Sequence, residues 1–322
     1  MTRKILVTGS AGWVGRALVE ALADLPHTRV VAVSRNRGTP PTVHVDQGFV
    51  GDIGAHTPWQ PLLQNIDCVV HAAARVHVMQ ETAENPLALF REVNTAGTLN
   101  LARQAAEAGV RRFVFLSSIK VNGESTEKGR AFTPDAEPNP TDPYALSKHE
   151  AEQGLLAVAR QSGMEVVIIR PVLVYGPGVK ANFAQLMRWV HRGVPLPLGA
   201  IANARSLVSL DNLVDFIRVC IDHPAAANEV FLVSDGRDLS TTDLIKGLRA
   251  HMPSSGWLIP VPSVVLRVGA ALLNRRAAAQ RVLGSLQVDI SKNQALLRWV
   301  PPVTVEAGLK KTVDHFLATD RK

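Results

Sequence analysis

The sequence contains little cysteine, and its cysteines form no motif. Only two of the 322 residues are cysteine, Cys68 and Cys220, and they stand far apart without a C-x-x-C pattern or neighbouring metal ligands. This scarcity excludes a disulfide framework and predicts no metal site. Isolated cysteines of this kind are typical of buried thiols in a reduced compartment, so we expect a cytoplasmic protein.

Long hydrophobic runs and clusters of one charge are also absent. The most apolar later segment, residues 257–273, is broken by Pro260, Pro262 and Arg267, so we expect no transmembrane segment. The net charge is +7, but the basic residues are scattered, and nucleic acid is not expected as a partner. A small anionic ligand, such as a dinucleotide or a nucleotide diphosphate, fits this charge, and so does a surface simply rich in arginine.

The first half of the chain alternates short β-rich runs with helical ones. This alternation predicts an α/β fold, a Rossmann-type doubly wound parallel sheet with helices on both faces. We expect strands at 4–8, 30–34, 48–52, 68–72, 113–117 and 166–170, with helices at 13–23, 86–108 and 143–162 between them.

The texture of the sequence changes after residue 171, where loops rich in glycine and proline join shorter elements. We expect residues 1–171 to form a dinucleotide-binding domain and residues 172–322 to form a smaller, interleaved substrate lobe, with the ligand cleft between them. The run E-V-F-L-V-S at 229–234 is expected to be a strand that returns to the main sheet. Helices are expected at 183–192, 212–222, 241–251, 263–273 and 305–317.

The N-terminal stretch R-K-I-L-V-T-G-S-A-G-W-V-G places three glycines between a strand and a helix. Glycine permits a tight turn and lets backbone N–H groups approach a pyrophosphate at the positive end of the helix. The stretch therefore predicts a dinucleotide-binding loop. Its contacting residues are expected to be Gly9, Ser10, Gly12, Trp13, Val14 and Gly15.

The end of the second expected strand bears on which dinucleotide is bound. NAD-binding chains usually place an acidic residue there, whereas this chain has Ser34 and Arg35. These side chains can bond a ribose 2′-phosphate, which a carboxylate would repel, so NADP(H) is favoured and NAD(H) stays possible. The alternative is an exposed polar turn. Further cofactor contacts are expected at Asp52, Ile53, Ala72, Ala73 and Ala74, although small alanines also suit tight helix packing.

The stretch P-Y-A-L-S-K-H-E-A-E, residues 143–152, reads as the start of a helix capped by Asp142. Tyr144 and Lys148 are four residues apart and share one face of that helix. The other charges of the stretch read as an ordinary solvated surface. Tyrosine and lysine at this spacing are common on surface helices too, so the pair indicates chemistry only together with a cofactor site and a pocket.

The glycine triplet, Ser117-Ser118 and Tyr144-x-x-x-Lys148, in this order, resemble the short-chain dehydrogenase/reductase superfamily. The length and second half resemble its extended branch, which acts mainly on nucleotide sugars. The resemblance implies that Tyr144 exchanges a proton with a substrate oxygen while hydride moves to or from nicotinamide. It also implies that Lys148 lowers the pKa of the phenol and holds the nicotinamide ribose. Ser118, or alternatively Ser117, would bond the reacting carbonyl, and Asn94 would support Lys148 through water.

Residues 170–178, R-P-V-L-V-Y-G-P-G, also resemble relatives in this branch. The resemblance places the backbone near Pro171 and Val172 beside the nicotinamide. It implies substrate contacts from Ser117, Lys120, Asn122, Tyr175, Asn182 and Arg205. Helix capping by Asn182 and a surface charge at Arg205 are the alternatives, and Lys120 and Asn122 depart from the residues common in relatives.

Three stretches, at 117–126, 180–183 and 232–241, are most similar to bacterial polysaccharide-cluster reductases. These convert a UDP-2-acetamido-2,6-dideoxy-4-keto-hexose to UDP-N-acetylquinovosamine, and such chains are often labelled UDP-glucose 4-epimerase. The resemblance therefore implies a 4-ketoreductase with a UDP-sugar substrate, active in surface polysaccharide (O-antigen) synthesis. A 4-epimerase that keeps NAD bound is the alternative activity, and a homodimer is a possible assembly.

Overall fold

A single parallel sheet organises the protein. The computed structural model describes residues 2–36, 45–76, 85–253 and 256–319. Within them, seven strands pair in the order β3-β2-β1-β4-β5-β6-β9. The strand order reverses direction between β1 and β4, as in a Rossmann-type sheet, so the predicted fold class is confirmed. The strands are β1 Arg3–Thr8, β2 Thr28–Ser34, β3 Val45–Phe49, β4 Cys68–His71, β5 Arg112–Leu116, β6 Glu165–Pro171 and β9 Val230–Val233.

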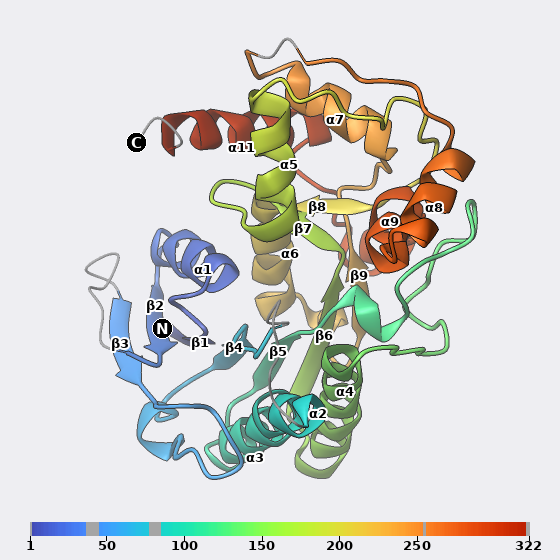
Figure 1. The fold of residues 1–322 in the computed structure, drawn as a ribbon. Coiled ribbons are helices and arrows are strands. Elements are labelled where there is room, and N and C mark those ends of the chain that lie inside the picture. The colour runs from blue at the N-terminus through green and yellow to red at the C-terminus, as the bar shows by residue number, and fades with distance from the viewer. Residues whose placement is uncertain (1, 37–44, 77–84, 254–255, 320–322) are drawn as a thin grey trace.

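Helices cover both faces of the sheet (Figure 1). On one face, α1 (Trp13–Ala23) and α6 (Leu210–Asp222) share an apolar cluster with Ile5 and Val7 of β1. On the other face, α3 (Thr98–Glu107) and α4 (Pro143–Ser162) pack in a cluster that includes Leu6. Successive strand residues point to opposite faces, so one continuous apolar strand fills both layers.

A second lobe lies above the sheet in Figure 1, and the chain enters it directly after β6. It has its own apolar core and a two-stranded parallel sheet. The chain leaves this lobe to form β9, which pairs with β6 and extends the main sheet. The elements of the lobe are β7 Leu173–Tyr175, α5 Ala181–His191, β8 Leu207–Ser209, α7 Thr241–Arg249, α8 Ser263–Leu272, α9 Arg276–Leu283 and α11 Val305–Thr319. The helix α10, Ser291–Leu297, packs against β9 of the main sheet.

Three features differ from the sequence-based expectations. The helix predicted over 86–108 is α2 (Pro86–Phe90), then a π-helical segment (Arg91–Gly97), then α3. β3 begins and ends three residues earlier than predicted, because Val45 to Phe49 pair with β2. The short strands β7 and β8 and the helices α9 and α10 were not predicted, because three-residue strands carry almost no periodicity.

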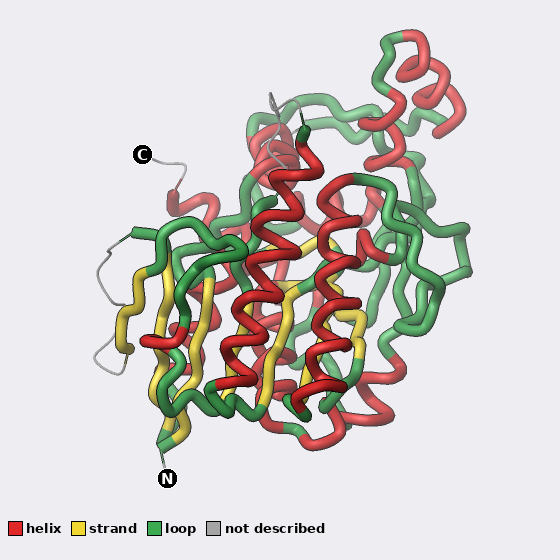
Figure 2. Tube along the Cα trace, turned by 90° about the horizontal axis from the view of Figure 1, so that it is seen from below, coloured by secondary structure: helices red, strands yellow, loops and turns green. Residues whose placement is uncertain are grey.

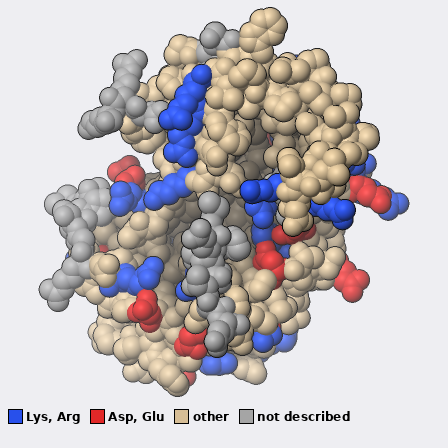
Figure 3. Space-filling model, viewed as in Figure 1, with Lys and Arg blue, Asp and Glu red and all other residues tan. Residues whose placement is uncertain are grey.

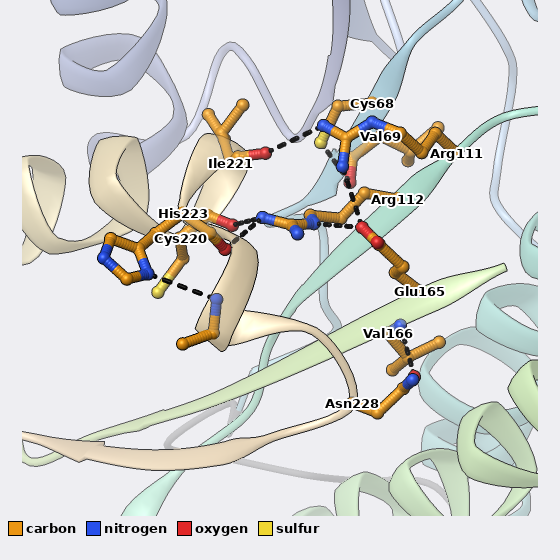
Figure 4. Close-up of polar contacts among 11 residues, drawn as sticks. Cys68, Val69, Arg111, Arg112, Glu165, Val166, Cys220, Ile221, His223 and Asn228 are labelled. Atoms are coloured by element: carbon orange, nitrogen blue, oxygen red, sulfur yellow. Dashed lines mark hydrogen bonds and ion pairs between the residues drawn. The ribbon is translucent and has the colours of Figure 1, made fainter. Parts of the chain in front are cut away.

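Buried Arg112 ties the sheet to α6 at the end away from the second lobe (Figure 4). Its Nη1 donates to the carbonyl oxygens of Cys220 and His223 at 2.8 and 3.0 Å, and its Nε donates to Glu165 at 2.8 Å. The predicted buried thiols are confirmed, since Cys68 and Cys220 are both free and buried. Burial raises the pKa of Cys68 to about 12 and raises that of Cys220 as well, so both stay protonated.

Candidate active site

The first turns of α4 carry Tyr144 and Lys148 into the protein. The Asp142 side chain accepts a hydrogen bond from the backbone N–H of Ala145 at 2.7 Å, which caps the helix as predicted. Tyr144 is half-buried, and Lys148 is only 1% exposed. The ring of Phe90 packs edge-on against Tyr144, with centroids 6.1 Å apart. The pair does not lie on a solvated helix face, which removes the surface-helix alternative.

The Lys148 ammonium lies in an apolar setting. Its Nζ is 4.1 Å from the centre of the Phe115 ring, on β5. Burial lowers the pKa of Lys148 to about 7, while the negative charge of Glu152 acts in the opposite direction. A lysine with such a pKa changes its charge near neutral pH, which is a property of groups that take part in proton transfer.

The Tyr144 phenol meets the side chain of Ser118. Burial and the charge of Asp142 raise the pKa of Tyr144 to about 12, and the hydrogen bond with Ser118 lowers it by less. The expected lowering by Lys148 is not seen, because an amine with a pKa of about 7 is already neutral at the pH where this phenol titrates. Tyr144 is therefore a neutral phenol at pH 7, beside a hydroxyl that can hold the same substrate oxygen.

Ser117 and Asn122 lie in a buried polar network beneath this pair. Arg170 donates from Nε and Nη2 to the two oxygens of Glu152, at 3.0 and 2.5 Å. Ser117 donates to Glu152, and the Asn122 side-chain oxygen accepts from Arg170 at 3.0 Å. All four residues are at most 5% exposed. Ser117 and Asn122 thus do not belong to an open substrate surface as expected, and the reading of Glu152 as a solvated charge was wrong.

Asn94 braces α4 from the π-helical segment. Its side-chain oxygen accepts from the backbone N–H of Arg75 at 2.8 Å, and its amide donates to the hydroxyl of Ser147 at 3.0 Å. Thr95 also reaches α4, donating to the carbonyl oxygen of Ser147 at 2.9 Å. A π-helical turn adds a residue to the helix and often occurs at functional sites. Here it lets consecutive residues hold the backbone beside Lys148.

The N-terminal glycines allow backbone segments to approach more closely than a side chain would permit. Gly9 has φ +68°, and a Cβ on it would lie 2.8 Å from the backbone nitrogen of Ala73. A Cβ on Gly15 would lie 2.1 Å from the carbonyl oxygen of Gly9. Gly12 is the residue before α1 and gives its end no side-chain cap, so the first N–H groups of α1 are not occupied by a capping side chain. These features fit a pyrophosphate at the helix N-terminus.

The ends of β2, β3 and β4 surround this loop. The backbone N–H of Ser10 donates to the carbonyl oxygen of Val33 at 3.2 Å, which places the loop against the end of β2, next to Ser34 and Arg35. The Ser34 hydroxyl donates to the carbonyl oxygen of Asn36 at 2.7 Å. Arg35 lies 3.3 Å from Asp52 in an exposed ion pair. Such a pair contributes about 0–1 kcal/mol, so an incoming phosphate can take the place of Asp52.

The remaining residues predicted to contact the cofactor lie in the glycine loop and near the ends of β3, β4 and β6. Trp13 donates its indole N–H to the carbonyl oxygen of Pro177 at 2.7 Å, which joins the glycine loop to the second lobe. Pro171 and Val172 are buried where β6 ends. Ser10, Val14, Ile53, Ala72, Ala73 and Ala74 are all half-buried.

The expected substrate contacts in the second lobe fall into two groups. Tyr175 is fully buried, donates to Asp235 at 2.7 Å and stacks on Phe183, so its side chain belongs to the core of the lobe. Asn182, in the first turn of α5, is exposed. Arg205 is half-buried, and its Nη1 donates to the carbonyl oxygen of Gly284 at 3.2 Å. Only the exposed or half-buried residues of this group remain available to a ligand.

Open space lies between the two lobes and, separately, along the second lobe. Figure 3 shows a hollow between the two lobes with Lys and Arg side chains along its rim. Two cavities of about 460 and 360 Å³ lie on either side of the segment 200–203, and Lys128 lines both. Ala204 and Leu239, which flank and pair with Arg205, line the larger one. Lys120 lies in an ion pair with Asp142, two residues before Tyr144 in the chain.

Three functional residues escaped the sequence reasoning. Glu152 and Arg170 were missed because only the folded chain brings them together, although Glu152 stands one further helical turn from Lys148. His71 is fully buried between the hydroxyls of Thr8 and Thr98, at 2.7 and 3.0 Å. Burial, and then the charge of Lys148, lowers the pKa of His71 to about 3. A histidine of that kind is neutral at pH 7 and positions its neighbours rather than exchanging protons.

Comparisons with known proteins agree with this arrangement. A family model described as "NAD dependent epimerase/dehydratase family" matches residues 5–234. A Vibrio cholerae protein named UDP-glucose 4-epimerase is 49% identical over 100% of this chain and 98% of its own length. A Pseudomonas aeruginosa protein named GDP-6-deoxy-D-mannose reductase is 26% identical over 96% of both chains. The solved structure of UDP-glucuronic acid 4-epimerase from Bacillus cereus in complex with NAD has the same fold, with a TM-score of 0.77, 22% identity and coverage of 98% of this chain and 99% of that chain.

Proposed function

This chain belongs to the NAD dependent epimerase/dehydratase family, and from that premise we propose that it is a nucleotide-sugar 4-ketoreductase. The proposed reaction reduces the C4 ketone of a UDP-4-keto-6-deoxy-N-acetylhexosamine, with NADPH, to UDP-N-acetylquinovosamine or a close analogue. Its proposed role is in surface polysaccharide synthesis. Enzymes of both the epimerase and the reductase type occur among the named relatives, so the family alone supports either activity.

The observation that carries the choice of reductase is the end of β2. Ser34 and Arg35 stand beside the glycine loop, on a strand end where an NAD-specific site would place a carboxylate. The pair of Arg35 with Asp52 is exposed and weak, so Arg35 can exchange it for a 2′-phosphate. A preference for NADPH suits net reduction, whereas an epimerase needs no exchange of its cofactor.

The protonation of Tyr144 is compatible with the same direction. When bound, the cofactor supplies the hydride that goes to C4 of the sugar. Tyr144, a neutral phenol with a raised pKa, donates its proton to the ketone oxygen, and Ser118 hydrogen-bonds that oxygen. The Lys148 ammonium then stabilises the phenolate until solvent restores the proton. Glu152 and Arg170 form the buried network beneath Tyr144 and Lys148, and the charge of Glu152 favours the Lys148 ammonium.

The epimerase remains a second candidate because of the relative with 49% identity that is named UDP-glucose 4-epimerase. An epimerase would first remove a proton from a sugar hydroxyl, so Tyr144 would have to start as a phenolate. The pKa of about 12 belongs to Tyr144 in the free protein, and the positive charge of an oxidised nicotinamide would lower it in an epimerase. The choice between the two activities consequently rests on Ser34 and Arg35. The reductase is therefore the proposal, with the epimerase as the outcome to be excluded.

The test is an incubation of the protein with NADPH and a UDP-4-keto-6-deoxy-N-acetylhexosamine, and separately with UDP-glucose and UDP-N-acetylglucosamine. We expect NADPH oxidation, and a reduced product by mass spectrometry, only in the incubation that contains the keto sugar. Tyr144→Phe should reduce turnover by about two to four orders of magnitude while the melting temperature and NADPH affinity stay nearly unchanged. C4 epimers of the UDP-sugars, formed without NADPH consumption, would contradict the proposal.

A further inference from the structure

Helix α8 leaves an apolar face uncovered. None of its ten residues, S-V-V-L-R-V-G-A-A-L, is buried. Val264, Val268 and Leu272 are four residues apart, so they share one face, and they are 67%, 56% and 83% exposed. Trp257 before the helix and Leu273 after it are 78% and 75% exposed. Large apolar side chains gathered in this way mark an interaction surface more often than chance.

A different side of α8 faces the rest of the protein. Ser263 and Arg267, one turn apart, line the cavity of about 360 Å³ together with Gln280 and Leu283 of α9. This side of α8 therefore faces the cavity between the helix pair and the rest of the second lobe. In Figure 2 the pair projects from the rest of the molecule at the upper right. The apolar face consequently remains accessible to a partner outside the chain.

The segment that forms α8 and α9 carries charge of one sign. The chain contains 28 acidic residues, yet none lies between Asp243 and Asp289. The same segment contains Lys246, Arg249, Arg267, Arg275, Arg276 and Arg281. Arg275, Arg276 and Arg281 are exposed at the tip and along α9. The acidic residues of the loop that lines the same cavity, Glu124 and Glu127, are paired with Lys120 and Arg130. An apolar face beside the exposed arginines of α9 is complementary to a surface that is apolar within and anionic at its edge.

We propose that α8 and α9, with Trp257, dock on the surface of an anionic lipid bilayer. The valines, leucines and tryptophan would enter the headgroup boundary, and the arginines would contact lipid phosphates. Within the described residues, no helix is long and apolar enough to cross a membrane, so the element lies on the surface. A second copy of the chain fits less well, because a symmetric contact would bring arginines against arginines.

The proposal is tested with the full chain and lipid vesicles, measured by co-sedimentation in about 0.1 M salt, where charges are screened over roughly 10 Å. Vesicles of phosphatidylcholine alone are compared with vesicles that also contain phosphatidylglycerol. We expect binding only to the second kind, weakening as salt is raised. A basic residue near such a surface contributes about 1 kcal/mol, or about fivefold in binding, so Arg275→Glu/Arg276→Glu should weaken binding by more than tenfold.

Matched variants separate a local site from general positive charge. Arg103→Glu/Arg192→Glu changes the net charge equally, at exposed positions on α3 and after α5, and should change binding by less than about threefold. Trp257→Ala should weaken binding, whereas Trp189→Ala, at a tryptophan that is 42% exposed on α5, should not. Turnover of a water-soluble nucleotide sugar should be unchanged in all four variants, so this test does not depend on the proposed function.

Three outcomes would overturn the docking proposal. The first is a lack of binding to phosphatidylglycerol vesicles, and the second is an equal loss of binding in both arginine double variants. The third is a change in mass by light scattering, without lipid, when Leu272→Ser/Leu273→Ser is introduced. That result would assign the apolar face to a contact between copies of the chain.

Discussion

Replacing Glu152 by glutamine should shift the pH dependence of the enzyme. Glu152 is the group whose negative charge raises the pKa of Lys148, against a larger lowering by burial. Two unit charges about 6 Å apart, the spacing of neighbours one helical turn apart, interact by roughly 3 kcal/mol at an effective dielectric constant of about 20. Arg170 binds the same carboxylate at 2.5 Å and offsets about half of this interaction. About one pKa unit, or ~1.4 kcal/mol, is the effect that remains at Lys148.

The sign of the shift follows from which form of Lys148 is active. Reduction needs the ammonium, which is present below the pKa of about 7 and is lost as pH rises through it. In Glu152→Gln the pKa of Lys148 falls further. The alkaline limb of the profile of kcat against pH should therefore move to lower pH by about one unit.

The matched control is Glu150→Gln on the same helix. Glu150 pairs with Arg91 toward solvent and is 24% exposed, so the change in charge is equal but lies outside the buried network. Glu152→Gln should also lower the free energy of unfolding by about 3 kcal/mol, because it leaves Arg170 buried with a neutral partner. Thermal unfolding measures this term. A profile that shifts equally in both variants, or in neither, would refute the role given to Glu152.

Further predictions concern the lysine, the glycine loop and the cofactor. Burial lowers the pKa of Lys148 to about 7, so its cost is full below that pH and fades as pH rises toward 10.5. Lys148→Met should accordingly raise the melting temperature at pH 6 by several degrees relative to wild type, while turnover is lost. This gain in melting temperature should shrink above pH ~10. A variant that melts at the same temperature as wild type at both pH values would contradict this. Gly15→Ala forces a Cβ to 2.1 Å from the Gly9 carbonyl oxygen, so NADPH affinity should fall at least tenfold by fluorescence titration, whereas Gly269→Ala, with open space around it, should have no effect. Arg35→Ala should remove most of a preference for NADPH over NADH of about tenfold to hundredfold, measured as the ratio of the two Kd values, and a wild type that prefers NADH would refute the cofactor assignment.

Local signals in the sequence located much of the fold. The bounds of α1 and α4 agree with prediction because residues next to each helix start mark it. These are the glycines before Trp13 for α1 and Asp142-Pro143 for α4. The π-helical segment was not predictable in this way, since the helical periodicity of residues 86–108 continues through it. Only contacts of Asn94 and Thr95 with Ser147 on α4 reveal why the helix widens.

In the candidate site too, local sequence predicts some features and tertiary contacts determine the others. Tyr144 and Lys148 are neighbours by helical spacing, and the structure brings Ser118 to the phenol. The resemblance favoured Ser118 and kept Ser117 as the alternative, and adjacent residues after a strand point to opposite sides. One therefore enters the network of Glu152 and Arg170, and the other faces Tyr144. Burial of Asn122 and Tyr175 likewise depends on partners 48 and 60 residues away, which no local pattern encodes.

The most direct test of the central claim follows a deuterium label. The protein is incubated with a UDP-4-keto-6-deoxy-N-acetylhexosamine and NADPH deuterated at C4 of its nicotinamide ring, and the sugar product is examined by mass spectrometry and NMR. Net reduction predicts one deuterium at C4 of the sugar for each NADPH consumed. A product without deuterium, or an enzyme that inverts C4 of a UDP-sugar with a cofactor that does not exchange, would contradict the 4-ketoreductase and favour the epimerase.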